Sequence, residues 1–128
     1  MNPRVDWTRN LKDQYLLIEL TDCCNLRCPM CSHSRAEAPH GDKIGFMDFS
    51  LYKKILTEIT PKNKPMAWKL FWLGESLLHP QIDKILYFTY GKIKDLSRQE
   101  YIDLHTNGLL MTPEITEVLL DMNYNFLV

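Results

Sequence analysis

The chain has 128 residues, of which 15 are Lys or Arg and 16 are Asp or Glu, so its net charge at pH 7 is −1. This balance excludes a nucleic-acid or membrane partner held by charge alone, and the contents of five Gly and seven Pro exclude a collagen-like or low-complexity chain. The first ten residues contain no apolar signal segment, and no apolar run approaches the roughly 18 residues that cross a bilayer, which indicates a cytoplasmic protein.

The first half of the chain predicts a strand, a cysteine-containing loop and a helix. Residues 15–20 (YLLIEL) form a short apolar run that suits a buried strand. The polar stretch 32–45 is too irregular for a regular element. From residue 48 or 50 to about residue 60, before Pro61, apolar residues recur at helical spacing. The buried stripe expected for this helix consists of Leu51, Ile55, Leu56 and Ile59.

The middle of the chain predicts a second strand and a second helix. Residues 67–73 (AWKLFWL) favour a strand, with Trp68 and Trp72 in the core. Pro80 suits a helix start, and Gly91 is the predicted stop.

The last part predicts a third strand, a third helix and the beginning of a fourth strand. Residues 101–105 (YIDLH) form the strand. Thr112 is the predicted cap of a helix that Asn123 would end, after which residues 125–128 (NFLV) are expected to be extended.

Strands that alternate with helices in this way are typical of a parallel α/β sheet, in which functional groups collect on the loops at the carboxyl ends of the strands. The cysteines follow the first strand, Gly74 and Glu75 follow the second, and the segment 106–108 (TNG) follows the third. We therefore expect these three loops to meet at one edge of the sheet.

The cysteine loop has the spacing of a metal site. All four cysteines lie within nine residues: Cys23, Cys24, Cys28 and Cys31. The last three follow the pattern C-x3-C-x2-C, and three thiolates can hold a four-iron cluster while one iron stays open. Zinc is the alternative, since Cys28 and Cys31 form a C-x2-C pair that His33 or His40 could complete.

Residues 19–31 (ELTDCCNLRCPMC) resemble the signature of the radical S-adenosylmethionine (radical SAM) superfamily, most closely the branch with SPASM-containing peptide- and protein-modifying enzymes. Residues 73–75 (LGE) resemble the family's GGE motif, and residues 104–108 (LHTNG) resemble the usual end of its third strand. Leu73 and Ser76 depart from the pattern, because Gly and Pro are usual there.

The resemblance implies a fold and a domain division. Residues 15–128 would be a truncated radical SAM core domain, with three βα units and a fourth strand that form the first half of a partial, TIM-like barrel. Residues 1–14 would be an N-terminal extension. We expect such a piece to be marginally stable and prone to self-association.

The resemblance also implies two cofactors and the residues that bind them. Cys24, Cys28 and Cys31 would ligate a 4Fe-4S cluster, and S-adenosylmethionine would chelate its open iron. The residues expected to contact S-adenosylmethionine are Met30 near the adenine, Gly74 near the methionine moiety, Glu75 near the ammonium, and Thr106 and Asn107. For Cys23, His33, His79 and His105 the expectation is a structural role or simple solvation.

The function that the resemblance implies is reductive cleavage of S-adenosylmethionine to a 5′-deoxyadenosyl radical, which abstracts hydrogen from a substrate. An electron donor such as flavodoxin or ferredoxin would be a partner, and a peptide or protein the substrate. Whether this chain is itself an enzyme stays open, because it ends before the family's later strands. The alternatives are a non-catalytic cluster-binding fragment and a small zinc-binding interaction domain.

Overall fold

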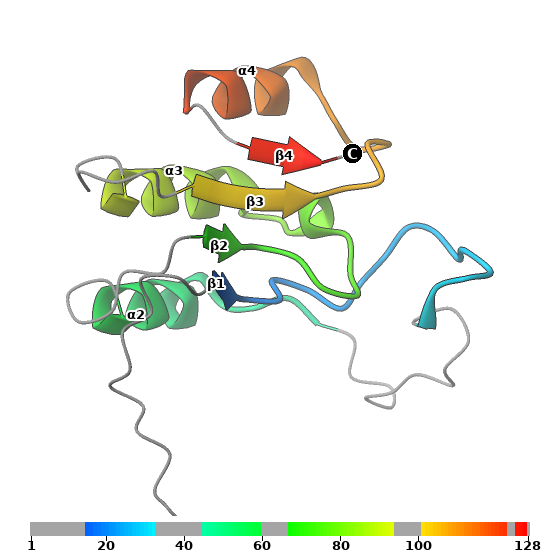
Figure 1. The fold of residues 1–128 in the computed structure, drawn as a ribbon, viewed down its shortest axis with the longest axis horizontal. Coiled ribbons are helices and arrows are strands. Elements are labelled where there is room, and N and C mark those ends of the chain that lie inside the picture. The colour runs from blue at the N-terminus through cyan, green and yellow to red at the C-terminus, as the bar shows by residue number, and fades with distance from the viewer. Residues whose placement is uncertain (1–14, 33–44, 60–66, 94–100, 123–124, 128) are drawn as a thin grey trace, which may run out of the picture.

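The computed structural model describes residues 15–32, 45–59, 67–93, 101–122 and 125–127. The predicted N-terminal extension, His33, His40, Asn123 and Val128 lie outside these ranges. Strands and helices alternate along the chain (Figure 1), in the order β1 Tyr15–Leu17, α2 Phe49–Ile59, β2 Ala67–Lys69, the 3-10 helix η2 Ser76–Leu78, α3 Ile82–Ile93, β3 Tyr101–His105, α4 Pro113–Asp121 and β4 Asn125–Leu127.

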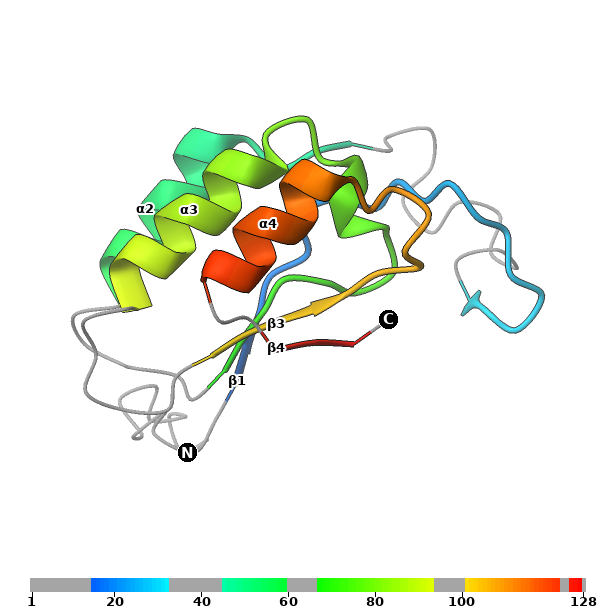
Figure 2. The ribbon, with the colours of Figure 1, turned by 90° about the horizontal axis from the view of Figure 1, so that it is seen from above.

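The four strands form one parallel sheet in the order β1-β2-β3-β4. Leu16 is level with Trp68, which is level with Ile102 on the next strand. Helices α2, α3 and α4 all lie on the same face of this sheet (Figure 2), as expected when parallel neighbours are joined by helical crossovers. The parallel α/β fold predicted from the sequence is therefore confirmed. None of the helices in the described ranges has the length and apolar character needed to cross a bilayer.

The core lies between the sheet and the helices. Every second strand residue faces the helices, so the strands contribute alternate apolar side chains. The buried apolar residues in this layer include Trp68, Leu70, Ile102 and Leu104 from the sheet side and Tyr52, Leu56, Ile85, Leu86 and Leu119 from the helices. Removing this area from water is the main driving force that holds the helices on the sheet.

Two strands are shorter than predicted. The pairing of β1 and β2 ends at Leu17 and Lys69, although the predicted strands run to residues 20 and 73. Single backbone bonds from Ile18 to Lys69 and from Leu70 to Asp103 continue the contact before the loops diverge. The prediction that Trp72 is in the core is wrong, because it follows the paired segment and is 60% exposed.

The helices match the predictions at some positions and depart from them at others. Thr112 caps α4 as predicted, since its hydroxyl accepts a hydrogen bond from the backbone N–H of Ile115 at 3.3 Å. Gly91 does not stop α3, which continues to Ile93, because an exposed glycine is tolerated inside a helix. In α2 the buried side chains are Tyr52 and Leu56, whereas the predicted core residue Leu51 is 48% exposed.

A buried hydrogen bond accounts for the inward position of Tyr52. Its hydroxyl lies 2.6 Å from the Thr89 hydroxyl on α3, which donates in turn to the carbonyl of Ile85 at 2.6 Å. The Tyr52 phenol is therefore the donor to Thr89. Burial raises the pKa of Tyr52 above its ordinary value, so the phenol remains a neutral donor. The pair joins α2 to α3 inside the core.

We predict that Tyr52→Phe lowers the free energy of unfolding by about 1 kcal/mol, because it removes a buried hydrogen bond and leaves the ring in place. Urea unfolding measures the change. The matched control is Tyr87→Phe on α3, whose side chain is exposed. Equal effects of the two substitutions would contradict a structural role for the Tyr52 hydroxyl.

Candidate functional site

The loops that follow β1, β2 and β3 leave the sheet at the same edge (Figure 1). They contact one another directly. The backbone N–H of Glu75 donates to the carbonyl of Cys23 at 2.7 Å, and the side-chain amide of Asn107 donates to Asn25 Oδ1 at 2.8 Å. The predicted meeting of the cysteine loop, the Gly74-Glu75 loop and the 106–108 loop is therefore confirmed.

The cysteine loop is organised by bonds to its own backbone. The N–H of Leu26 points at Cys24 Sγ, 3.4 Å away, and the N–H of Cys31 donates to the carbonyl of Cys28 at 3.0 Å, which makes a tight turn. The Arg27 guanidinium folds back onto the carbonyls of Cys24 and Leu26, at 2.9 and 3.0 Å. Arg27 is exposed, but it also ties the loop together.

The thiols are suitable ligands for an iron–sulfur cluster, but their side chains are not close together in this structure. All four cysteines are free and partly exposed. In the described part of the chain, no three His, Cys, Asp or Glu side chains are close enough to hold a metal ion. Thiolates are nevertheless the ligands that iron–sulfur clusters prefer, and N–H groups directed at sulfur, as at Cys24, tune such sites. The chemistry of Cys24, Cys28 and Cys31 thus fits a cluster.

The backbone around Cys23 forms the base of the loop. The N–H of Cys23 donates to Thr21 Oγ1 at 3.0 Å, and the Thr21 hydroxyl donates to the carbonyl of Gly45 at 2.7 Å. Asp22 accepts the N–H of Gly45 at 2.7 Å. Both ends of the excursion that contains the cysteines are therefore held together at residues 21–23 and 45.

Gly74 is required by the packing of two backbones. A Cβ at this position would lie 1.9 Å from the carbonyl oxygen of Thr21 and 2.9 Å from that of Cys23. The sequence predicted that glycine is needed at position 74 to let the backbone approach a ligand. The structure adds a second reason for glycine there, because the loop after β2 touches the loop after β1. Any larger residue would push these loops apart.

Glu19 is a site residue to which the sequence gave no role. Its Oε1 accepts the N–H of Leu73 at 2.9 Å and that of Gly74 at 3.4 Å, so it holds the loop after β2 from the side of β1. These contacts span 54 and 55 residues of sequence. The available signal was an acidic residue inside the apolar run 15–20, within the segment that resembles the family signature.

Glu75 is a buried carboxylate, only 3% exposed, with three hydrogen bonds. Its Oε1 accepts the N–H of Leu77 at 3.0 Å and the hydroxyl of Thr106 at 2.8 Å, and its Oε2 accepts the N–H of Asn107 at 2.8 Å. The two oxygens of a carboxylate offer about four acceptor positions, so one more donor can be accommodated. The structure thus brings together three of the predicted cofactor residues.

The loop after β3 is a turn built for these contacts. Gly108 has φ of 75°, in the left-handed region that favours glycine. The Thr106 hydroxyl accepts the N–H of Gly108 at 3.1 Å, and Asn107 Oδ1 accepts the N–H of Leu109 at 3.0 Å. The turn leaves the Asn107 amide free to donate to Asn25 on the cysteine loop, a link that the sequence did not predict.

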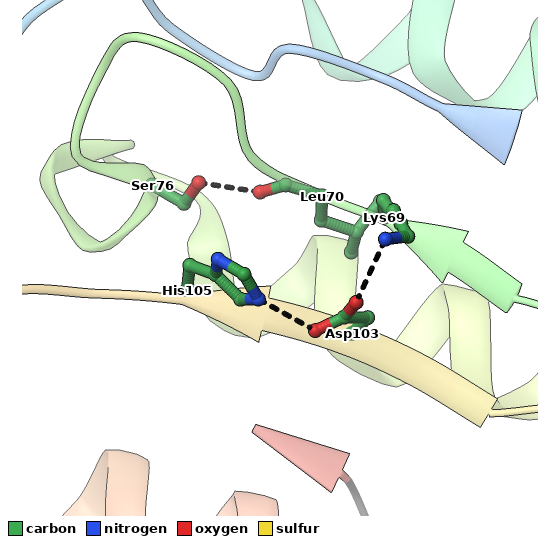
Figure 3. Close-up of polar contacts among 5 residues, drawn as sticks. All are labelled: Lys69, Leu70, Ser76, Asp103 and His105. Atoms are coloured by element: carbon green, nitrogen blue, oxygen red, sulfur yellow. Dashed lines mark hydrogen bonds and ion pairs between the residues drawn. The ribbon is translucent and has the colours of Figure 1, made fainter. Parts of the chain in front are cut away.

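Three further positions complete the site. Met30 is 81% exposed, so its side chain packs little against the described chain. The predicted contact between Met30 and an adenine stays a prediction. Ser76, where the family usually has Pro, is buried, and its hydroxyl donates to the carbonyl of Leu70 (Figure 3). His79 is buried and structural, as predicted, since its ring nitrogens contact the carbonyl of Met47 and the N–H of Gln81.

Comparison with known proteins identifies relatives and a similar fold. No protein-family model matches the chain. It is 28% identical over 110 residues to the tungsten-containing aldehyde ferredoxin oxidoreductase cofactor-modifying protein of Pyrococcus furiosus, and 34% identical over 99 residues to the GTP 3′,8-cyclase of Microcystis aeruginosa. These alignments cover 85% and 76% of the chain, respectively, but only 28% of each relative's length.

The fold is similar to that of BtrN, whose crystal structure was determined in complex with AdoMet and 2-DOIA. The TM-score is 0.76 at 22% identity, and the match covers 91% of this chain and 45% of BtrN. The open form of BtrN gives a TM-score of 0.73 at the same identity. The strand and helix order described above is thus that of the N-terminal half of BtrN.

We predict that Gly74→Ala destabilises the protein by about 1–3 kcal/mol, because the new methyl group meets backbone that no rotamer change can move away. Urea unfolding measures the loss. The control is Gly91→Ala, where the added Cβ meets no atom within 4 Å apart from its chain neighbours and the backbone of its own helix; it should stabilise α3 by roughly 0.5–1 kcal/mol. If Gly74→Ala behaved like Gly91→Ala, the contact between the two loops would not exist in solution.

Proposed function

Because the chain belongs to the radical SAM superfamily, we propose that its three loops bind a 4Fe-4S cluster and S-adenosylmethionine for reductive cleavage of the cofactor. One observation carries this proposal: the cysteine loop contacts both the Gly74-Glu75 loop and the Thr106-Asn107 loop. The three motifs of the family resemblance thus lie next to one another at the carboxyl edge of a parallel sheet, which supports a single site there.

The cysteines are the proposed cluster ligands. Cys24, Cys28 and Cys31 would supply three thiolates, and their partial exposure leaves the cluster accessible to an electron donor such as flavodoxin or ferredoxin. When bound, the reduced cluster supplies the electron that splits S-adenosylmethionine into methionine and a 5′-deoxyadenosyl radical, which abstracts hydrogen from a substrate. Arg27 and the N–H of Leu26 would keep the loop in shape around it.

Glu75 is the proposed partner of the cofactor's ammonium group. Its carboxylate is held by Thr106, Asn107 and Leu77, and about one of its acceptor positions stays unused. A positive ligand would be favourable there, because a charged hydrogen bond is stronger than a neutral one and a buried carboxylate benefits from a counter-charge. Thr106 and Asn107 would then act through Glu75, by fixing where its charge lies.

The remaining assignments follow from position. The backbone of Gly74 would lie against the methionine moiety, and the exposed thioether of Met30 could pack on the adenine. A peptide or protein is the proposed substrate, on the basis of the SPASM-like signature. The relatives include proteins named for GTP cyclisation and for modification of the cofactor of an aldehyde ferredoxin oxidoreductase, so the substrate of the whole protein has to be found by experiment.

We predict that Cys24→Ala, Cys28→Ala and Cys31→Ala each abolish cluster binding, whereas Cys23→Ala retains it. Anaerobic reconstitution followed by iron, sulfide and zinc analysis measures this. A cluster that survives removal of all three cysteines would contradict the ligand assignment. Stoichiometric zinc in place of iron would favour a zinc-binding interaction domain.

We predict that Glu75→Gln weakens S-adenosylmethionine binding by at least about tenfold, the scale of one lost charged hydrogen bond, while iron content stays near wild type. Isothermal titration on the reconstituted protein measures the affinity. Thr106→Val is the comparison variant, because it removes one donor to Glu75 and keeps the carboxylate, so we expect it to lose less affinity than Glu75→Gln. If both variants lost affinity equally, Glu75 would act only as a link between loops.

A further inference from the structure

The face of the sheet opposite the helices carries a polar cluster. Since Trp68, Leu70 and Leu104 belong to the helix-side core, alternation places Lys69, Asp103 and His105 on the other face. No helix of the described ranges covers this face (Figure 2). Parallel strands usually read as continuous apolar runs, so a cation, a carboxylate and an imidazole at neighbouring positions are unusual.

The three side chains meet between β2 and β3 (Figure 3). Lys69 and Asp103 are paired in register, and the ammonium Nζ lies 3.5 Å from Asp103 Oδ2. The other carboxylate oxygen, Oδ1, lies 3.2 Å from His105 Nε2. Asp103 therefore stands between the two, with one oxygen directed at each partner.

Aromatic rings hold the outer members of this cluster. The imidazole of His105 is stacked on Phe71, with ring centroids 3.7 Å apart and planes within 10° of each other. The Lys69 ammonium lies over the ring of Tyr15, 4.5 Å from its centroid. Such contacts restrict both side chains without using the second nitrogen of His105.

The exposure of the side chains increases from Asp103 to Lys69 to His105. The Asp103 side chain is 12% exposed and that of Lys69 is 26% exposed, whereas the His105 side chain is 43% exposed. The Asp103 carboxylate is thus mostly buried, whereas the His105 imidazole is partly accessible to solvent. In Figure 3 the Nδ1 side of the ring points away from Asp103.

The position of His105 connects this face with the proposed cofactor site. It is the last residue of β3 and directly precedes Thr106, whose hydroxyl bonds to Glu75. A molecule on this face of the sheet, near the carboxyl edge, would lie beside His105, one residue away along the chain from the hydrogen bond between Thr106 and Glu75. We propose that His105, oriented by Asp103, exchanges a proton with the substrate there, and that the substrate presents a hydroxyl or a protonated amino group to His105 Nδ1.

The proton step balances without any further reactant. The O–H or N–H bond of the substrate breaks, its electron pair stays on oxygen or nitrogen, and a new N–H bond forms at His105 Nδ1. The imidazolium keeps its Nε2 proton toward Asp103, whose negative charge compensates the positive charge gained. Lys69 and Asp103 are positioning residues in this scheme, because they act through His105.

The contact between His105 and Asp103 is an ion-pair contact rather than an aligned hydrogen bond. Nε2 is buried and at ion-pair distance from the carboxylate, but it is not aligned as a hydrogen bond within the described chain. Contacts of catalytic pairs often tighten only when the substrate is in place. This inference rests on the proposed function, since the substrate of that reaction would occupy the open face.

The test uses diethyl pyrocarbonate, which acylates neutral, accessible imidazole nitrogens, with mass spectrometry to follow each histidine of the whole chain at about pH 8. We expect His105 to react and His79, which is buried with both nitrogens engaged, to stay protected. Asp103→Asn should slow the reaction of His105 by about tenfold, because a carboxylate that orients an imidazole also raises its reactivity. Asp83→Asn, an exposed change in the first turn of α3, is the control.

The outcomes are decisive either way. An unreactive His105 in the wild type, or an equal rate in Asp103→Asn, would overturn the proposal. If Asp103→Asn makes His79 reactive, the fold has been lost, and Lys69→Gln then replaces it as the test variant. A slower acylation of His105 in Lys69→Gln supports the proposal, and an unchanged rate overturns it. Nitrogen-15 NMR provides a second criterion, since a proton on Nδ1 of the neutral ring would also overturn the proposal.

The two proposals fail separately. The reactivity of His105 is measured without cluster or cofactor, so it can be normal in a protein that never cleaves S-adenosylmethionine. Conversely, the protein can bind the cluster and cleave the cofactor while His105 reacts at the same rate with and without the Asp103 carboxylate. That result would refute the proposed role of His105 and leave the proposed function intact.

Discussion

The backbone of the loop after β2 touches the backbone of the cysteine loop at Gly74, where a Cβ would lie 1.9 Å from the carbonyl oxygen of Thr21. This approach allows the N–H of Glu75 to reach the carbonyl of Cys23, and Glu19 secures it from the other side. The loops after β1 and β2 can lie this close only because Gly74 has no Cβ. The distance between the cysteines and Glu75 therefore depends on this glycine. The site is therefore sensitive to volume at position 74 before any ligand is considered.

A buried carboxylate makes the second connection, between β2 and β3. An ionised group in the interior is unfavourable unless its hydrogen-bonding capacity is used. Glu75 meets this requirement with donors from its own 3-10 helix and from Thr106 and Asn107. The same bonds leave about one acceptor position on the carboxylate, so the stability of the loop and the proposed contact with a cationic ligand depend on the same group.

Local patterns in the sequence predicted those features that depend on local interactions. The bounds of β3 and the cap at Thr112 follow from composition and from side-chain chemistry within a few residues. Predictions failed where distant contacts decide the outcome. Trp72 is exposed because pairing with β3 has ended, and Tyr52 turns inward to meet Thr89, 37 residues away. The bonds of Glu19 and Asn25 to later loops span even longer separations, so a local pattern can mark these residues as unusual but cannot identify their partners.

The two faces of the sheet obey different physical requirements. On the helix side, Trp68, Ile102 and Leu104 are excluded from water and are selected for packing. On the other side, Lys69 and Asp103 occupy the register positions between them, where an apolar pair would be at least as stable. A charged pair at such positions is hard to explain by stability alone. It becomes understandable if this face is where a polar molecule is bound next to Thr106 and Glu75, because the residue that joins the two regions, His105, is the exposed end of the cluster.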